Sequence, residues 1–363
     1  MSGFAGGVPP SLVAGSAEAP AVRYDVALLD LDGVVYVGPH AVPGIPAALD
    51  GARAAGMRLG FVTNNASRTP EEVAGHLTAL DVPASAAEVI TSSQAAATVV
   101  VQRLGVGARV LPVGGPGVAA ALRAAGLTVV TDAGAEPLAV VQGYGRDVGW
   151  TELAEAVVAV RNGAEHVATN ADATIPSPRG PLPGNGALVG VVSAVTGRRP
   201  LVTGKPDPAM HAECVRRTGA RRPLVVGDRL DTDVEGGRRA GAATLLVLTG
   251  VTDPATLLAA GPDQRPDLLA PDAAGLLTTH PAVVADDGGW RCGAWSARSE
   301  AGDGPLRLGR HVAGAAASAD GLDGLRALCV AHWARYPDTA APARVVAADE
   351  AAAAELQRWG LPS

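Results

Sequence analysis

The chain has 363 residues, of which 48% are hydrophobic and 18% charged, a composition typical of a globular protein with more than one domain. The formal net charge of -7 and the lack of any Lys/Arg run argue against nucleic acid as a partner. No apolar run is long enough to span a bilayer, and the three cysteines are widely separated, so we expect no membrane partner and no disulfide framework.

Residues 1–20 are rich in Gly, Ala, Ser and Pro and lack the basic start of a signal peptide. They predict a disordered tail on a cytoplasmic protein. Beyond this tail, short apolar runs that end in Gly or Asp alternate with Ala-rich helical stretches. This alternation predicts an α/β fold whose core is a doubly wound, Rossmann-like parallel sheet.

Four of the apolar runs carry polar residues at their carboxyl ends. The runs are 24–29, 58–62, 201–202 and 223–226, and the loops after them read DLDG, TNN, GKP and GD. Ligands of open parallel sheets bind beyond the carboxyl ends of the strands. We therefore expect these four loops to converge on one site.

The stretch between the second and third runs has strand-like segments of its own, at 110–113, 128–131, 139–142 and 165–169. It predicts an inserted α/β domain over residues 93–199, within a core formed by residues 21–92 and 200–280. Residues 281–363 hold several tryptophans and two helical stretches, at 322–335 and 349–359. They predict a small, separate α+β domain.

Asp30 and Asp32 follow the first apolar run, and Gly33 permits a sharp turn after them. A surface turn would use the same letters, but the strand in front aims the pair at the sheet edge, and the ligand spacing of an EF-hand is missing. Asp228 is expected to join them from another strand end. Three carboxylates within about 5 Å would repel by roughly 3 kcal/mol per pair at an effective dielectric near 20. A cation is therefore expected, and an oxygen-only ligand set fits Mg²⁺.

Lys205 is the only lysine among 29 Lys and Arg residues. A biased composition could leave one lysine by chance, yet this one stands at a predicted strand end. Its compact ammonium suits a phosphoryl group, with the Thr63 hydroxyl and the amides around Asn64 as further donors. Carboxylates, metal, lysine and hydroxyl together indicate phosphoryl transfer through an aspartyl phosphate.

The motifs DLDGV (30–34), FVTNNAS (61–67), GKP (204–206) and GDRLDTD (227–233) occur in an order that resembles the haloacid dehalogenase superfamily. With the large insert, they resemble its class II-capped branch of 4-nitrophenylphosphatases, phosphoglycolate phosphatases and glycerol-phosphate phosphatases. The resemblance covers about residues 24–275.

The resemblance implies that Asp30 is the nucleophile and that Asp32 first protonates the leaving oxygen and then activates water. Asp30, the backbone carbonyl of Asp32 and Asp228 would hold Mg²⁺, with Asp233 supporting the metal or its waters; the role of Asp231 stays open. Phosphate and substrate contacts are expected from Gly33, Thr63, Asn64, Asn65, Lys205, Asn170 and Asp172. Asparagine also favours turns that carry no site, and this preference explains part of the occurrence of asparagines among these residues.

The insert would be a cap that closes over the site and reads the leaving group. A cap of this size favours a small, free phosphate ester: glycerol 3-phosphate or another small polyol, glycolate or sugar phosphate, with phosphoglycolate and pyridoxal phosphate as alternatives. Glycerolipid metabolism is the expected setting and a homodimer an expected assembly.

Other readings of the motifs are weaker. The stretch 115–120 meets a loose GxGxxA pattern, but Pro116 removes an amide, and Pro206 stands where a Walker A motif needs Ser or Thr. The C-terminal segment resembles the degenerate N-acetyltransferase-like domain that follows some bacterial phosphatases. It lacks a pyrophosphate-binding loop, so we favour a packing or interaction role over a bifunctional phosphatase/N-acetyltransferase.

Overall fold

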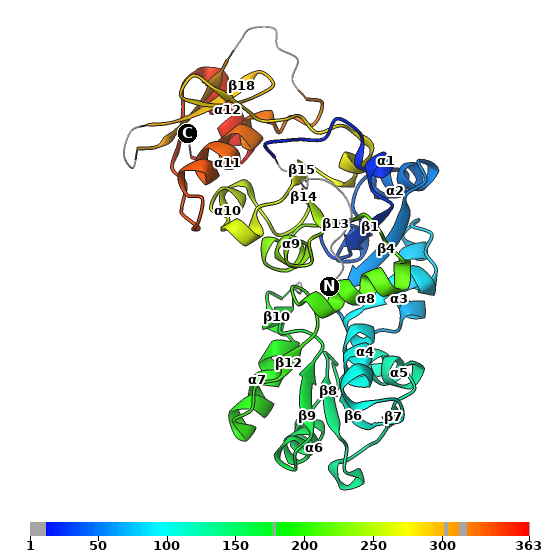
Figure 1. The fold of residues 1–363 in the computed structure, drawn as a ribbon. Helices are drawn as coiled ribbons and strands as arrows, with labels where there is room; N and C mark the ends of the chain where they lie inside the picture. Colours follow the sequence, from blue (N-terminus) through cyan, green and yellow to red (C-terminus); the bar gives the residue numbers. More distant parts are fainter. Residues whose placement is uncertain (1–11, 176, 178, 301–303, 312–317, 363) are drawn as a thin grey trace. The chain divides into compact units, whose positions relative to one another are not determined.

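The computed structural model describes residues 12–175, 177, 179–300, 304–311 and 318–362. The chain divides into two compact units (Figure 1). The first unit comprises Met1–Leu59 and Ala220–Ser363, and the second comprises Gly60–Gly219. Strand β4 (Arg58–Thr63) begins in the first unit and ends in the second. Within the described residues, no helix has the length and apolarity that a bilayer crossing requires.

The first unit contains a parallel sheet in the order β15-β14-β13-β1. Nearly every residue of these strands is buried, as expected for parallel strands covered on both faces. Leu29 pairs with Val226, so Asp30 and Asp228 leave the sheet at the same edge. The elements of this part are β1 (Val26–Asp30), β2 (Tyr36–Val37), β3 (His40–Ala41), β13 (Pro223–Gly227), β14 (Ala243–Val247), β15 (Leu268–Ala270), α1 (Pro20–Arg23), α2 (Ile45–Ala54), α9 (Glu235–Arg239) and α10 (Pro254–Leu258).

The C-terminal part of the first unit is a second sheet with two helices. Strands β16 to β19 pair antiparallel and β20 adds a parallel edge. Its apolar core is continuous with that of the parallel sheet, since Leu246 and Leu269 share one buried cluster with Leu325 and Trp333. The elements are β16 (Val284–Asp286), β17 (Gly289–Cys292), β18 (Trp295–Ser299), β19 (Leu306–Arg310), β20 (Val345–Ala347), α11 (Asp323–Arg335) and α12 (Glu350–Arg358).

The second unit is built on a five-stranded parallel sheet in the order β12-β9-β8-β6-β7. One apolar cluster joins the sheet to α4 and α5, and another joins it to α6 and α7, so both faces are covered. Strand β5 pairs parallel with β4. The elements are β5 (Val89–Thr91), β6 (Arg109–Val113), β7 (Thr128–Val129), β8 (Ala139–Gln142), β9 (Glu165–Ala168), β10 (Thr174–Ile175), β11 (Leu182–Pro183), β12 (Leu201–Val202), α3 (Pro70–Ala79), α4 (Ser92–Leu104), α5 (Pro116–Ala124), α6 (Trp150–Arg161), α7 (Asn185–Thr196) and α8 (Pro208–Thr218).

The predicted α/β fold with a parallel core and an α+β C-terminal part is confirmed. Strand β12, however, lies in a different sheet from the one predicted. Leu201 pairs with Val167, so β12 is an edge strand of the sheet in the second unit. The expectation that all four polar loops follow strands of one sheet is therefore wrong. The apolar pair Leu201-Val202 indicates a strand, but it does not indicate which strand pairs with it.

The N-terminal segment also differs from its prediction. Residues 1–11 lie outside the described residues, but Ser16 exchanges two backbone hydrogen bonds with His280, of 2.7 and 2.9 Å. Leu12 is buried in the same apolar cluster as Trp333. The described part of the predicted tail is thus ordered, because its backbone pairs with the chain near residue 280.

Candidate active site

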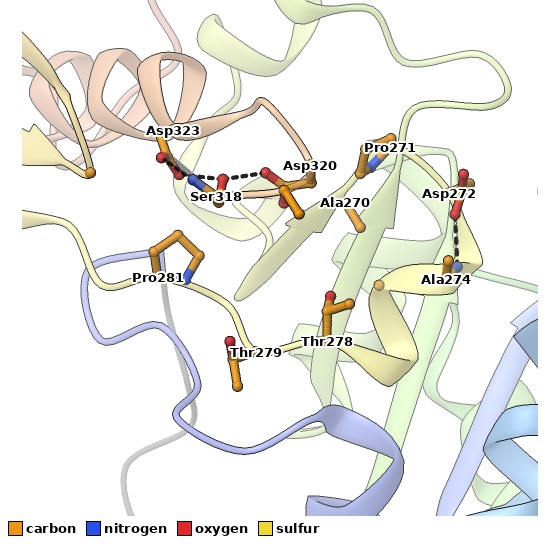
Figure 2. A pocket seen from close by; sticks show the side chains of 13 residues that line it. Ala270, Pro271, Asp272, Ala274, Thr278, Thr279, Pro281, Ser318, Asp320 and Asp323 are labelled. Atoms are coloured by element: carbon orange, nitrogen blue, oxygen red, sulfur yellow. Dashed lines mark hydrogen bonds between the residues drawn. The ribbon is translucent and has the colours of Figure 1, made fainter. Parts of the chain in front are cut away.

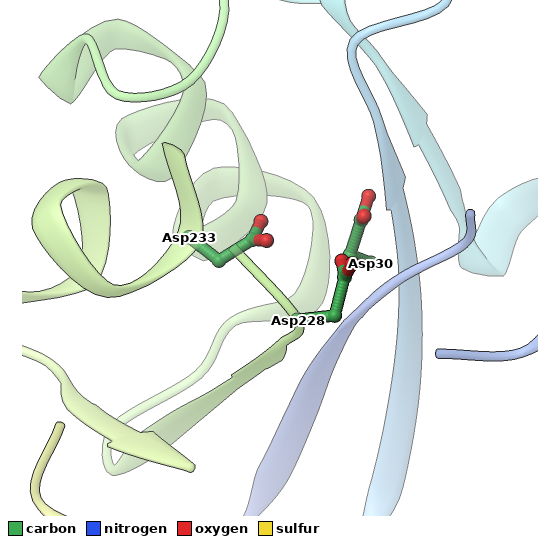
Figure 3. A group of neighbouring side chains, drawn as sticks. All are labelled: Asp30, Asp228 and Asp233. Atoms are coloured by element: carbon green, nitrogen blue, oxygen red, sulfur yellow. The ribbon is translucent and has the colours of Figure 1, made fainter. Parts of the chain in front are cut away.

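Three aspartates of the first unit gather at the edge of its parallel sheet (Figure 3). Asp30 is the last residue of β1, Asp228 follows β13, and Asp233 lies in the π-helical turn Leu230–Val234. Each offers a carboxylate oxygen, and these oxygens lie within 4.8 Å of one another. Asp228 and Asp233 are buried. Ionised carboxylates at such spacing repel one another, and a bound cation or a shared proton relieves this repulsion; an all-oxygen ligand set fits Mg²⁺.

Gly33 and Gly250 lie close against the carboxylate of Asp228, and the loop after β14 donates a hydrogen bond to it. A Cβ on Gly33, whose φ is +88°, would lie 2.5 Å from Asp228 Oδ2, and a Cβ on Gly250 would overlap the same carboxylate. The Val251 amide donates to Asp228 Oδ2 at 2.6 Å, and the Thr249 hydroxyl donates to the Gly33 carbonyl at 2.5 Å. This loop was not among those predicted to form the site, although Thr249-Gly250 also follows an apolar run.

The remaining acidic residues of the motifs fall into different places. The side chain of Asp32 is exposed, and its backbone forms a bridge with Tyr36, so its carboxylate is not in the cluster. Asp231 forms an ion pair with Arg229 at 2.8 Å. Burial raises the pKa of Asp231, but the hydrogen bonds and charge of Arg229 outweigh it and lower that pKa. Asp231, whose role the sequence left open, thus takes part in a surface ion pair.

The second unit brings together the predicted phosphate and substrate residues around Asn64. Asn64 Oδ1 accepts from the Lys205 amide at 2.8 Å, and Asn64 Nδ2 donates to the Lys205 carbonyl at 3.1 Å. The same Nδ2 donates to Asp172 Oδ2 at 3.3 Å. Asn170 Nδ2 donates to the Asn64 carbonyl at 2.7 Å. These four residues therefore form one hydrogen-bonded group.

The neighbouring polar residues hold the loops in shape. Thr63 Oγ1 accepts from the Asn65 amide at 3.0 Å, and Asn65 Oδ1 accepts from the Ser67 amide at 2.9 Å, which closes a local turn. Asn185 Nδ2 donates to the carbonyls of Asn170 at 2.9 Å and Gln142 at 3.2 Å. Asn185, the first residue of α7, thus anchors the loop that carries Asn170.

Lys205 lies in a buried setting next to groups that stay neutral. It is 7% exposed. Burial, aided by the charge of Lys205, lowers the pKa of His211 to about 4. Burial raises the pKa of the Cys214 thiol to about 12. At neutral pH the nearby imidazole and thiol are therefore uncharged and do not neutralise the ammonium.

A pocket of about 750 Å³ lies elsewhere in the first unit (Figure 2). Its lining includes Asp272, Asp320 and Asp323, and the Ser318 Oγ lies 2.5 Å from Asp320 Oδ1 and 2.6 Å from Asp323 Oδ1. A wall of carboxylates repels a phosphate ester, and these carboxylates already have partners within the protein. The pocket is not suited to a phosphoryl substrate.

Comparison with known proteins identifies the family. The model of haloacid dehalogenase-like hydrolases matches residues 27–128, a related hydrolase model matches residues 202–276, and a GCN5-related N-acetyltransferase-like model matches residues 292–361. The D-glycerol 3-phosphate phosphatase of Mycobacterium tuberculosis is 42% identical over 94% of this chain and 95% of its own length. The chain belongs to the haloacid dehalogenase-like hydrolases. The predictions of this family and of a phosphatase enzyme are confirmed.

Other relatives agree with this assignment. An acid sugar phosphatase of Staphylococcus aureus is 38% identical over 63% of this chain and 88% of its own. Crystal structures of the M. tuberculosis glycerol phosphate phosphatase with calcium and with magnesium superpose with TM-scores of 0.85 and 0.84, at 40% and 41% identity, over 95% of this chain. The superpositions include 100% and 99% of the two crystal-structure chains. Together with the carboxylate cluster, the magnesium-bound relative confirms the predicted metal.

Proposed function

We propose that this phosphatase hydrolyses glycerol 3-phosphate or another small phosphate ester. The observation that carries the proposal is the cluster of Asp30, Asp228 and Asp233 in a chain 42% identical, almost end to end, to a D-glycerol 3-phosphate phosphatase. The similarity to an acid sugar phosphatase supports small sugar phosphates as further substrates. Phosphoglycolate and pyridoxal phosphate remain the alternatives to test.

The proposed Mg²⁺ ligands are Asp30, the backbone carbonyl of Asp32 and Asp228. All are oxygen donors, as Mg²⁺ prefers. Asp233 lies close enough in the cluster to contact the metal or one of its waters. When bound, the metal would offset the charge of the carboxylates and of the phosphoryl oxygens.

In the proposed reaction, a carboxylate oxygen of Asp30 forms a bond to phosphorus while the bond from phosphorus to the alcohol oxygen breaks. Asp32 gives its proton to that leaving oxygen, and its exposed position leaves it accessible to substrate. Asp32 then takes a proton from water, whose oxygen bonds to phosphorus and displaces the Asp30 carboxylate. Inorganic phosphate and the alcohol are the products.

The proposed phosphoryl contacts are the Thr63 hydroxyl, the Lys205 ammonium and the amides near Asn64 and Asn65, and Gly33 would leave room for the phosphoryl group. Asn170 and Asp172 would line the path of the leaving group. We retain the proposed division into a core of residues 21–92 and 200–280, a cap of residues 93–199 and a C-terminal domain of residues 281–363 with a packing role, except that β12 (Leu201–Val202) belongs to the sheet of the cap. Glycerolipid metabolism, a cytoplasmic location and a homodimer stay predictions.

A phosphate-release screen over small phosphate esters, with Mg²⁺ and with a chelator, tests the proposal. We expect release only with the metal, fastest with glycerol 3-phosphate, and at least a thousandfold less from Asp30→Asn. Asp81→Asn is the matched control, because Asp81 is exposed and its φ of +59° suits asparagine as well as aspartate. Full activity of Asp30→Asn would exclude the aspartyl-phosphate route.

A further inference from the structure

Asn64 encloses the backbone of Lys205 from both sides. Its Oδ1 accepts from the Lys205 amide at 2.8 Å, and its Nδ2 donates to the Lys205 carbonyl at 3.1 Å. A single side-chain amide thus satisfies both backbone polar groups of the residue that carries the chain's one ammonium. Such a bidentate contact fixes the direction in which the backbone presents its side chain.

The backbone next to Lys205 is closely packed against Asn64 and Thr169. A Cβ on Gly204 would lie 2.7 Å from Asn64 Oδ1 and would overlap the Thr169 carbonyl oxygen. Asn64 is itself held, because its carbonyl accepts from Asn170 Nδ2 and from the Ser92 hydroxyl, both at 2.7 Å. The Lys205 backbone is therefore packed between the loop after β4 and the loop after β9.

The Asn64 amide group is also shared with an acidic residue of the loop after β9. Asn64 Nδ2 donates to Asp172 Oδ2 at 3.3 Å, in addition to the Lys205 carbonyl. With both ends of its side chain engaged in this way, Asn64 is poorly placed to bind a phosphoryl oxygen through its amide group. This differs from the direct phosphate contact expected from the sequence.

We propose that Asn64 is a positioning residue: it holds Lys205 in the orientation that phosphoryl transfer requires and ties that orientation to Asp172. The inference rests on the proposed function, since it concerns the lysine that would contact the phosphoryl group. Loss of the two hydrogen bonds between Asn64 and the Lys205 backbone would leave the ammonium present, but Asn64 would no longer fix its direction. The turnover number should therefore fall more than the affinity for substrate.

The single lysine allows a test that does not depend on activity. Labelling with [¹⁵N]lysine gives one backbone amide signal, that of Lys205, whose hydrogen exchange reports the bond to Asn64 Oδ1. We expect Asn64→Ala to speed this exchange at least tenfold and to lower kcat at least thirtyfold with a smaller change in KM. Asn162→Ala, which removes the same amide at the exposed end of α6, should change neither.

A second pair of variants guards against a folding defect in Asn64→Ala. Asn64→Asp keeps the acceptor for the Lys205 amide but turns a second oxygen toward Asp172 and the Lys205 carbonyl, so kcat should again fall at least thirtyfold. Adding Asp172→Asn supplies a donor that faces the new carboxylate, and at least a tenfold recovery over Asn64→Asp is expected. Asp172→Asn alone gives the reference rate.

The outcomes separate the two proposals. Unchanged kcat in Asn64→Ala, with or without faster amide exchange, would overturn the positioning role, and so would the absence of recovery in the double variant. If the wild-type protein released phosphate from no ester, the proposed function would fall, and the exchange of the Lys205 amide would still decide whether Asn64 holds this residue.

Discussion

The guanidinium of Arg326, in α11, donates a hydrogen bond of 2.6 Å to the backbone carbonyl of Leu269, in β15. Arg326 is wholly buried and also pairs with Asp320 and Asp323. Burial opposes the ionisation of Asp320, but the hydrogen bonds and charge of Arg326 outweigh it and lower its pKa to about 2. One buried cation thus links the C-terminal sheet domain to the parallel sheet.

Replacing Arg326 should destabilise the first unit strongly. In Arg326→Met two acidic side chains lose their buried counter-charge, and removal of one partner of a buried ion pair costs about 3–5 kcal/mol. Urea unfolding should show this loss. Arg307→Met is the matched control, because its partner Glu300 and Arg307 itself are both exposed and such pairs contribute under about 1 kcal/mol. Equal stability of the two variants would contradict the role of Arg326.

Stability should fall as the pH is lowered from about 6.5 toward 4. Burial lowers the pKa of both His166 and His211 to about 4, from an ordinary value of 6.5. Between pH 4 and 6.5, each of these imidazoles is protonated in the unfolded chain and neutral in the folded chain. Each histidine therefore lowers the free energy of unfolding by about 1.4 kcal/mol per pH unit in this window and has no further effect below about pH 4.

Denaturant titrations at several pH values test this dependence. His211→Gln and His166→Gln should each reduce the slope by about 1.4 kcal/mol per pH unit, and the double variant by about twice that. Slopes that match the wild type would show that neither histidine is kept neutral by the fold.

Lys205→Arg should retain the fold and lose turnover. A planar guanidinium cannot take the place of a compact ammonium, and removing one preorganised donor typically lowers kcat by about 10²–10³. Steady-state kinetics on the best substrate of the screen would measure this. The reciprocal exchange Arg103→Lys, at an exposed ion pair with Glu165, should leave kcat unchanged. Wild-type turnover in Lys205→Arg would make the single lysine an accident of composition.

Gly250→Ala should weaken metal binding. The added Cβ would overlap the Asp228 carboxylate and displace it from the cluster. Loss of a contact that orients a metal ligand lowers affinity by about 10- to 100-fold. The Mg²⁺ concentration for half-maximal activity should rise accordingly. In Gly75→Ala, a Cβ meets nothing within 4 Å, so the same measurement should match the wild type.

The sequence predicted best where strand pattern alone decides position. A buried run followed by Asp identifies a strand end, and the carboxyl ends of neighbouring parallel strands lie at one edge. Asp30 and Asp228 are close because β1 pairs with β13 in register. Asp233 also belongs to this cluster, as its place in the motif suggested.

Other features depend on tertiary contacts that no local pattern encodes. The pairing of β12 with β9 could not be read from Leu201-Val202. The direction of the Asn64 amide is fixed by Lys205 and Asp172, which lie 141 and 108 residues away in the chain. The order of residues 12–20 depends on pairing with His280, although their composition resembles a flexible tail.

One buried apolar cluster contains both Leu12 and Leu361, whereas the second unit is a single run from Gly60 to Gly219. During translation, at about 5–20 residues per second, the second unit can therefore be complete while the cluster still lacks its C-terminal half for on the order of ten seconds. Until then, the apolar face of the nascent first unit has no cover. Loss of the cluster residues in α11 or α12 by premature termination should therefore yield an aggregation-prone product rather than a shorter enzyme.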